Sequence, residues 1–160
     1  MDKKTLAVIQ KVHELFKGRQ LTLSLAESCT GGLISHYLTT LPGASDFFEA
    51  GLVTYSVGIK KRILGISAET IAHYGVVSEE TAREMAEKVR MLTGTYCALS
   101  TTGNLGPGTL EGKERGLVYI AASKEGKTSA KELRLTEDRA LNKKKASVSA
   151  LEFLIEVLGK

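Results

Sequence analysis

Hydroxyl, thiol and carboxyl side chains gather in one short segment, LAESCTGGLIS at residues 25–35. The apolar run at 21–25 predicts a strand, and the pattern that follows Gly31 and Gly32 predicts a helix. N–H groups at the start of a helix bind anions and stabilise negative charge. Ser28 is therefore a candidate nucleophile with an oxyanion hole beside it, although a simple helix cap would explain the same serine.

A serine nucleophile needs a base, and the sequence offers a lysine more readily than a histidine. No Ser-His-Asp arrangement is suggested by the histidines, which all fall in helical patterns: His13, His36 and His73. Lys60 starts a helix after the second strand, and burial would lower its pKa enough for it to act as a base. Tyr55 could relay a proton between Lys60 and Ser28, or it could be a tyrosine at the edge of the core. The neighbouring Lys61-Arg62 pair fits a solvated basic turn.

Two later features could hold an anionic ligand. Residues 103–115, GNLGPGTLEGKER, form a glycine-rich loop that is long for a compact domain. Such loops are often functional, and glycines let the backbone approach a phosphate closely. Arg139 and Lys143 lie one helical turn apart, so they share a face and could neutralise a phosphate. A plain surface loop and solvent-exposed charges are the alternative interpretations.

The order of patterned segments predicts the fold class. Expected helices cover 3–17, 31–41, 78–93 and 138–158, with two short ones within 57–75; expected strands cover 21–26, 50–56, 96–102, 117–123 and 130–135. Strands and helices alternate early and a hairpin comes late. We therefore expect a single domain over residues 1–160, folded as a three-layer α/β/α sandwich with a mixed sheet. Ligands of such sheets bind beyond the carboxyl ends of the strands.

Composition narrows the class of protein. The chain has 160 residues, is 42% hydrophobic and 25% charged, and carries a net charge of +4. It has no aromatic-basic stripe and no nucleic-acid-binding motif, so we do not expect nucleic acid as a partner. No apolar stretch approaches the roughly 20 residues of a membrane span, and no signal peptide is visible. We expect a cytoplasmic protein in which Cys29 and Cys97 are reduced and partly buried.

Four segments, taken in order, resemble the CinA C-terminal domain family of nicotinamide-nucleotide amidases. They are AESCTGG, GLVTYS with a following K and LGI, YGVVSEETA, and TG…GPG…GLVYIA. The resemblance runs from about residue 5 to residue 158 and is closest to the stand-alone form of the domain. It implies hydrolysis of nicotinamide mononucleotide to nicotinate mononucleotide and ammonia, with no metal or redox cofactor. It also implies a small-molecule nucleotide as the ligand, and we expect a homo-oligomer.

The resemblance also implies roles for individual residues. Ser28 would attack the carboxamide, Lys60 would take its proton, and Tyr55 would assist and pass a proton to the leaving ammonia. N–H groups of residues 29–32 would bind the oxyanion, and water would then cleave the acyl-enzyme. Glu27 would orient the turn, bind a ribose hydroxyl or simply face solvent. The expected substrate-binding set is Glu27, Thr30, Gly31, Gly32, Thr102, Gly103, Gly106, Gly108 and Arg139.

The chain departs from the usual family pattern at several positions on the expected pocket walls. Val57 stands where the family has asparagine, the Asn104-Leu105 pair replaces a small apolar pair, and Arg115 replaces a proline. Lys143 stands in place of an arginine. Two alternatives therefore stay open beside the nicotinamide-nucleotide amidase: an amidase for a different small amide, and a non-catalytic nucleotide-binding or interaction module.

Overall fold

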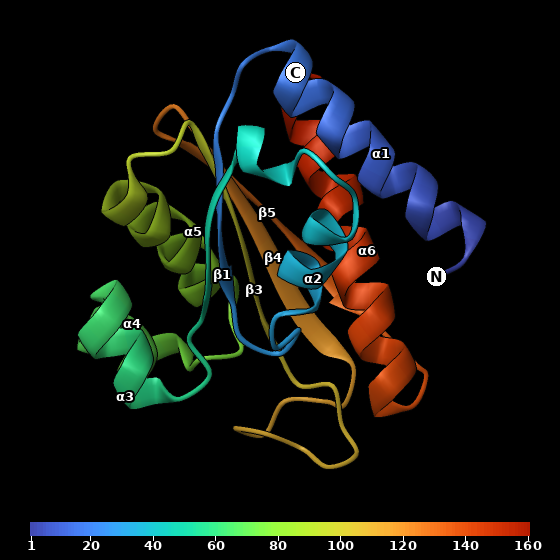
Figure 1. Ribbon diagram of the computed structural model, residues 1–160. Coiled ribbons are helices and arrows are strands. Elements are labelled where there is room, and N and C mark those ends of the chain that lie inside the picture. The colour runs from blue at the N-terminus through green and yellow to red at the C-terminus, as the bar shows by residue number, and fades with distance from the viewer.

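The computed structural model describes all 160 residues and contains one five-stranded sheet with helices on both faces (Figure 1). The strands are β1 (Leu23–Glu27), β2 (Phe48–Val53), β3 (Cys97–Gly103), β4 (Leu117–Lys124) and β5 (Lys127–Arg134). The helices are α1 (Lys3–Gly18), α2 (Leu33–Thr40), α3 (Val57–Ile59), α4 (Ala68–Tyr74), α5 (Glu79–Thr93) and α6 (Arg139–Leu158). A 3₁₀ turn, η1 (Ala44–Asp46), and a π-helical turn, η2 (Lys60–Leu64), complete the chain.

The sheet has the strand order β2-β1-β3-β4-β5 and is parallel in one half and antiparallel in the other. β1 pairs in parallel with both β2 and β3, while β4 is antiparallel to β3 and β5. The expected hairpin is β4–β5, and its turn residues Glu125 and Gly126 both have positive φ. Paired positive φ values match the right-handed twist of a tight hairpin.

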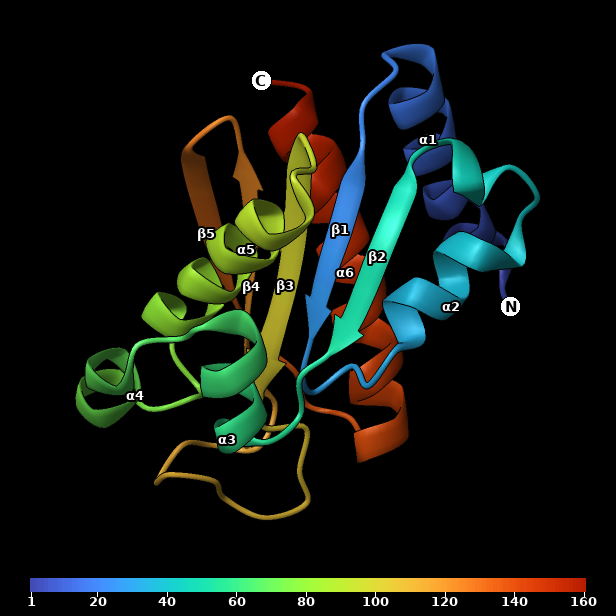
Figure 2. The same ribbon diagram turned by 60° about the vertical axis from the view of Figure 1, so that its left-hand side comes forward.

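Helices cover both faces of the sheet, so the expected three-layer sandwich with a mixed sheet is confirmed (Figures 1 and 2). On one face, α1, α2 and α6 share the main core with the inward side chains of the strands. On the other face, α5 packs through small and apolar side chains, among them Ala82, Ala86 and Met85. β1 is buried along its whole length, as expected for a parallel strand covered on both sides.

Side-chain caps fix where five of the six helices begin, and those of α4, α5 and α6 are examples. Ser67 accepts hydrogen bonds from the first turn of α4, Ser78 from Thr81 of α5, and Asp138 from Leu141 of α6. These caps satisfy N–H groups that would otherwise lack partners. Ser67 and Ser78 are of a residue type that prefers this position. The reciprocal half of a capping box is missing, because the Thr81 side chain donates to Gly75 instead.

The carboxyl ends of β1, β2 and β3 meet at one edge of the sheet, where the chain continues into Ser28, Thr54 and Asn104 respectively. The loop of residues 104–116 and the start of α6 lie at this same edge (Figure 2). Parallel strands therefore bring the three candidate segments together. No helix combines the length and the apolar character that crossing a membrane would require.

Candidate active site

Glu27, the last residue of β1, holds the turn that follows it from inside the protein. Its side chain is fully buried, and its carboxylate accepts five hydrogen bonds. The donors are the Thr30 hydroxyl, the N–H groups of Gly32, Ile34 and Ser35, and the Ser35 hydroxyl. The negative carboxylate thus closes the positive end of α2. The solvent-facing alternative for Glu27 is wrong.

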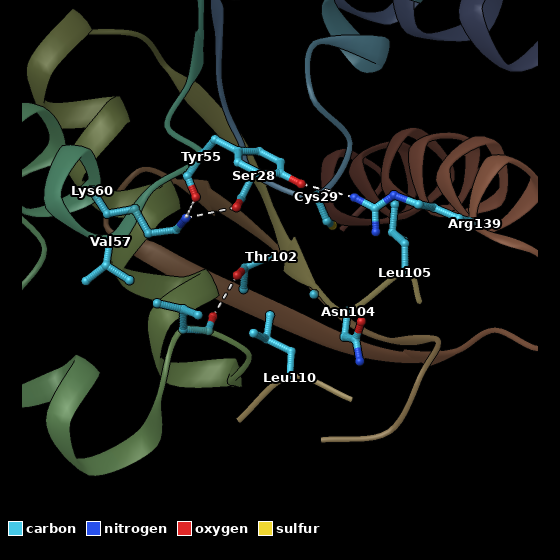
Figure 3. A pocket seen from close by; sticks show the side chains of 12 residues that line it. Ser28, Cys29, Tyr55, Val57, Lys60, Thr102, Asn104, Leu105, Leu110 and Arg139 are labelled. Atoms are coloured by element: carbon cyan, nitrogen blue, oxygen red, sulfur yellow. Dashed lines mark hydrogen bonds between the residues drawn. The ribbon is translucent and has the colours of Figure 1, made fainter. Parts of the chain in front are cut away.

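Ser28 and Lys60 form the central contact of the site (Figure 3). Lys60 Nζ lies 2.9 Å from Ser28 Oγ, and both side chains are buried. Nζ also lies 2.8 Å from the carbonyl oxygen of Thr54 and 3.0 Å from that of Tyr55. A neutral amine has two N–H donors and one lone pair. With both N–H groups on the carbonyls, the lone pair is left for the Ser28 hydroxyl proton.

Lys60 starts the π-helical turn η2, which the sequence did not reveal. Its side chain is 1% exposed, whereas Lys61 and Arg62 are exposed, as expected for a solvated basic turn. Burial lowers the pKa of Lys60 from 10.5 to about 8, because the charged ammonium loses its hydration. No carboxylate lies within salt-bridge distance of Lys60 Nζ to bring the pKa back to its ordinary value. A fraction of the lysine is therefore neutral at physiological pH.

The pH dependence of the expected amide hydrolysis should report the protonation state of Lys60. If Lys60 is the base, activity should rise about tenfold for each pH unit on the acid side and level off above about pH 9. The midpoint should lie near the lowered pKa of about 8. Initial rates between about pH 6 and about pH 10, in buffers of constant ionic strength, would measure it. A flat profile would contradict the assignment.

Cys29 lies beside Ser28 in the pocket wall, but its thiol is not a competing nucleophile. Burial raises the pKa of Cys29 to about 12, so the reactive thiolate is absent at neutral pH. Its backbone N–H and that of Thr30 make no hydrogen bond within the chain, whereas those of Gly31 and Gly32 are used internally. Of the expected oxyanion donors at 29–32, the unused N–H group that belongs to a residue lining the pocket is that of Cys29.

Tyr55 lies at the mouth of the site rather than between Lys60 and Ser28. Its side chain is 59% exposed, and its hydroxyl accepts a hydrogen bond of 3.0 Å from Arg139. Arg139 also donates to the carbonyl oxygen of Gly106, at 2.6 Å. Only the backbone carbonyl of Tyr55 contacts Lys60. In this structure the proton relay expected from the sequence is not formed, and Arg139 links Tyr55 to the glycine-rich loop.

A small cavity of about 120 Å³ opens over the Ser28–Lys60 pair. Three of the nine expected substrate-binding residues line it: Thr102, Gly103 and Arg139. The other six do not: Glu27 and Thr30 are fully buried in the turn, and none of the four glycines, Gly31, Gly32, Gly106 and Gly108, is in the lining. Four apolar residues complete the walls, namely Val57, Val76, Leu105 and Leu110. Nowhere in the chain do three or more His, Cys, Asp or Glu residues gather as metal ligands would.

Comparison with known proteins places this geometry in a family. The sequence profile of the CinA C-terminal domain matches residues 5–158, nearly the whole chain. The chain belongs to the CinA family. Among curated relatives, a CinA-like protein of Chloroherpeton thalassium is 44% identical over 155 residues, which cover 94% of this chain and 37% of the relative. Another, from Dictyoglomus thermophilum, is 48% identical over 145 residues, covering 89% and 35%. The chain thus spans little more than a third of these CinA-like proteins.

Solved CinA-family structures share the fold over their full length. The competence damage-inducible protein A of Klebsiella pneumoniae superposes with a TM-score of 0.94 at 32% identity, covering 97% of both chains. A competence/damage inducible protein of Agrobacterium tumefaciens gives a TM-score of 0.94 at 32% identity, covering 100% of this chain and 98% of that one. These likenesses confirm the expected family and fold.

The atypical Asn104 of this CinA domain organises the glycine-rich loop. Its side-chain amide donates to the carbonyl oxygens of Gly108, Lys113 and Glu114, and its side-chain oxygen accepts from the Gly106 N–H. One buried side chain thus ties both ends of the loop together. Asn104 is therefore a structural residue of this loop. Val57, the other atypical residue, contributes a half-exposed apolar surface to the pocket wall.

Sequence reasoning missed several contributors to the site. The carbonyl oxygen of Thr54 and the side chains of Val76 and Leu110 were not expected there. A backbone carbonyl leaves no residue-type signal, and isolated apolar residues look the same in a core and in a pocket. Glu111 was missed as well, although its position in a tight Glu-Gly turn was a usable signal.

Proposed function

We propose that this CinA domain is a serine amidase that hydrolyses the carboxamide of nicotinamide mononucleotide. The observation that carries the proposal is the 2.9 Å contact between Ser28 Oγ and the buried Lys60 Nζ. A lysine with a pKa near 8, hydrogen-bonded to a serine in a pocket, has the arrangement needed for a nucleophile and its base.

The proposed reaction uses Lys60 for each proton transfer. Ser28 Oγ attacks the carboxamide carbon while Lys60 Nζ takes the hydroxyl proton. The N–H group of Cys29, which lines the pocket, stabilises the oxyanion. Lys60 then gives its proton to the amide nitrogen, the C–N bond breaks, and ammonia leaves. Water, deprotonated by the same lysine, attacks the acyl-enzyme and releases the carboxylate product and Ser28.

The charge distribution favours a substrate with an anionic group outside the reacting end. The cavity is small, so the carboxamide and its ring fill it and the remaining ribose phosphate lies at the mouth. Arg139 stands at that mouth, one helical turn from Lys143, whose ammonium lies close to the surface of Gly31. Neither cation has a carboxylate partner. Their charges are therefore not neutralised within the chain and can attract a phosphate.

Ammonia release from nicotinamide mononucleotide tests the proposal. The wild type should turn over, and Ser28→Ala should fall by about 10³-fold or more. Ser67→Ala makes the same change at a remote helix cap, so it should keep wild-type activity. Full activity in a folded Ser28→Ala protein would show that Ser28 is not the nucleophile. A wild type that binds the nucleotide by calorimetry without turnover would instead support the non-catalytic module.

A further inference from the structure

The tip of the glycine-rich loop is a tight turn with an unusual residue in it. Leu110 and Lys113 pair across the turn, with N–H to carbonyl distances of 3.3 and 2.8 Å, and Glu111 and Gly112 are its central residues. Both central residues have positive φ, 56° and 70°. Glycine and asparagine adopt this backbone readily, whereas a longer side chain is strained in it. A glutamate here needs a compensating contact.

The Glu111 carboxylate makes that contact by accepting hydrogen bonds from the segment between α4 and α5. Its two oxygens accept from the N–H groups of Val76 and Val77 at 3.0 and 2.9 Å. A side chain at Gly75 would occupy the space of this carboxylate, since a Cβ there would lie 2.7 Å from one of its oxygens. On the same segment, Lys113 Nζ donates to the carbonyl oxygens of Tyr74 and Val77, at 3.3 and 2.8 Å. Both sides of the turn therefore hold residues 74–77.

The hydrogen bonds of Glu111 and Lys113 fix two walls of the active-site pocket relative to each other. Leu110 precedes Glu111 in the chain, and the Val76 N–H donates to the Glu111 carboxylate. The side chains of Leu110 and Val76 both line the cavity above Ser28. Leu110 is 45% exposed, so part of its apolar surface is open to a ligand. Figure 3 shows Leu110 on the loop side of the cavity, with Thr102 between it and Lys60. The Thr102 hydroxyl donates to the Val76 carbonyl oxygen and ties this wall to β3.

We propose that Glu111 is a positioning residue that sets substrate specificity. By tying the turn next to Leu110 to the backbone of Val76 and Val77, it fixes an apolar slot that accepts the flat ring of an aromatic carboxamide and orients its amide toward Ser28. Val57 adds a third apolar side chain to the lining of the same cavity. The inference rests on the proposed amidase function for the identity of the ring. It concerns ring binding, so it can be tested without turnover.

Calorimetry on the Ser28→Ala protein separates ring binding from phosphate binding. Nicotinamide mononucleotide carries both groups, whereas ribose 5-phosphate lacks the ring. Adding Glu111→Ala should weaken nicotinamide mononucleotide about tenfold, the scale of losing one good apolar contact. It should leave the affinity for ribose 5-phosphate unchanged. Glu114→Ala is the matched control, because Glu114 is in the same loop but pairs with Arg134 instead.

Each outcome decides the matter. A selective loss for nicotinamide mononucleotide supports the slot, and hydrogen exchange at Val76 and Val77 should quicken in the same variant. Equal weakening of both ligands, no weakening of either, or the same loss in Glu114→Ala overturns the inference. If the wild type releases no ammonia and the selective loss is still seen, the proposed amidase reaction fails while the ring slot stands. In an active wild type, Glu111→Ala should raise KM about tenfold and change kcat less than about threefold.

Discussion

Replacing Lys60 by methionine is expected to lower the proposed amide hydrolysis by about 10³-fold or more, because Ser28 would lose its proposed base. Methionine keeps much of the length of the side chain without a titratable nitrogen. The assay is ammonia release at about pH 8.5, where the wild-type lysine is largely neutral. Lys61→Met is the matched control, since Lys61 is the exposed neighbour without a contact to the site. Activity within tenfold of wild type in Lys60→Met would mean that another group takes the serine proton.

The same substitution should reveal the cost of burying the lysine. The folded-state pKa of Lys60 is about 8 and its ordinary value is 10.5. Between these values the unfolded chain binds one more proton than the folded chain, so stability rises with pH. This pH-dependent part of the unfolding free energy is lost as the pH falls through about 8. Relative to Lys60→Met, the wild type should gain up to about 3 kcal/mol of unfolding free energy from about pH 7 to about pH 11. Urea unfolding at several pH values, with Lys61→Met alongside, would measure this difference.

Glu27→Gln is expected to be the most destabilising single-atom exchange in the site region. The carboxylate accepts five hydrogen bonds and donates none. A glutamine would place an NH₂ group against two or three of those donors and remove the charge at the start of α2. The loss should be about 3–5 kcal/mol, as for a buried charge network that loses one partner. Activity should fall too, because the turn that carries Ser28 would be displaced.

Thermal and urea unfolding would check this expectation. A loss of about 4 kcal/mol corresponds to a fall in Tm of roughly 10 °C for a chain of this size. Glu49→Gln is the matched control, because Glu49 is exposed on β2 and makes no hydrogen bond or ion pair through its side chain. It should change stability by less than about 0.5 kcal/mol. A Glu27→Gln protein as stable as this control would show that the carboxylate does not hold the turn.

The arrangement of elements was largely predictable because it depends on local patterns. Apolar periodicity marked the strands and the long helices, and Ser67 and Ser78 marked two helix starts. The Glu125-Gly126 turn marked the hairpin. Boundaries moved by a few residues, and the strand order came only with the structure. The π-helical turn at Lys60 left no signal, since its wider winding depends on packing against the sheet.

The site was predictable in its residue types but less so in their contacts. Ser28 and Lys60 were expected to meet and do so in the structure. Tyr55 was expected between them, but its side chain turns toward Arg139, which comes from α6 at the far end of the chain. Glu27 was left with three possible roles, because only tertiary structure shows that its carboxylate points inward. Long-range partners of this kind cannot be read from spacing.

The two halves of the mixed sheet carry different parts of the site. The proposed nucleophile and base, Ser28 and Lys60, follow the parallel strands β1 and β2. Part of the pocket wall, including Leu105, Leu110 and Arg139, comes from the loop 104–116 and from α6, both connected to the antiparallel half. Glu27 braces the nucleophile turn without help from that second half. In the proposed amidase, substitutions in this loop and on this helix face would therefore change which amide is bound without altering the Ser28–Lys60 pair.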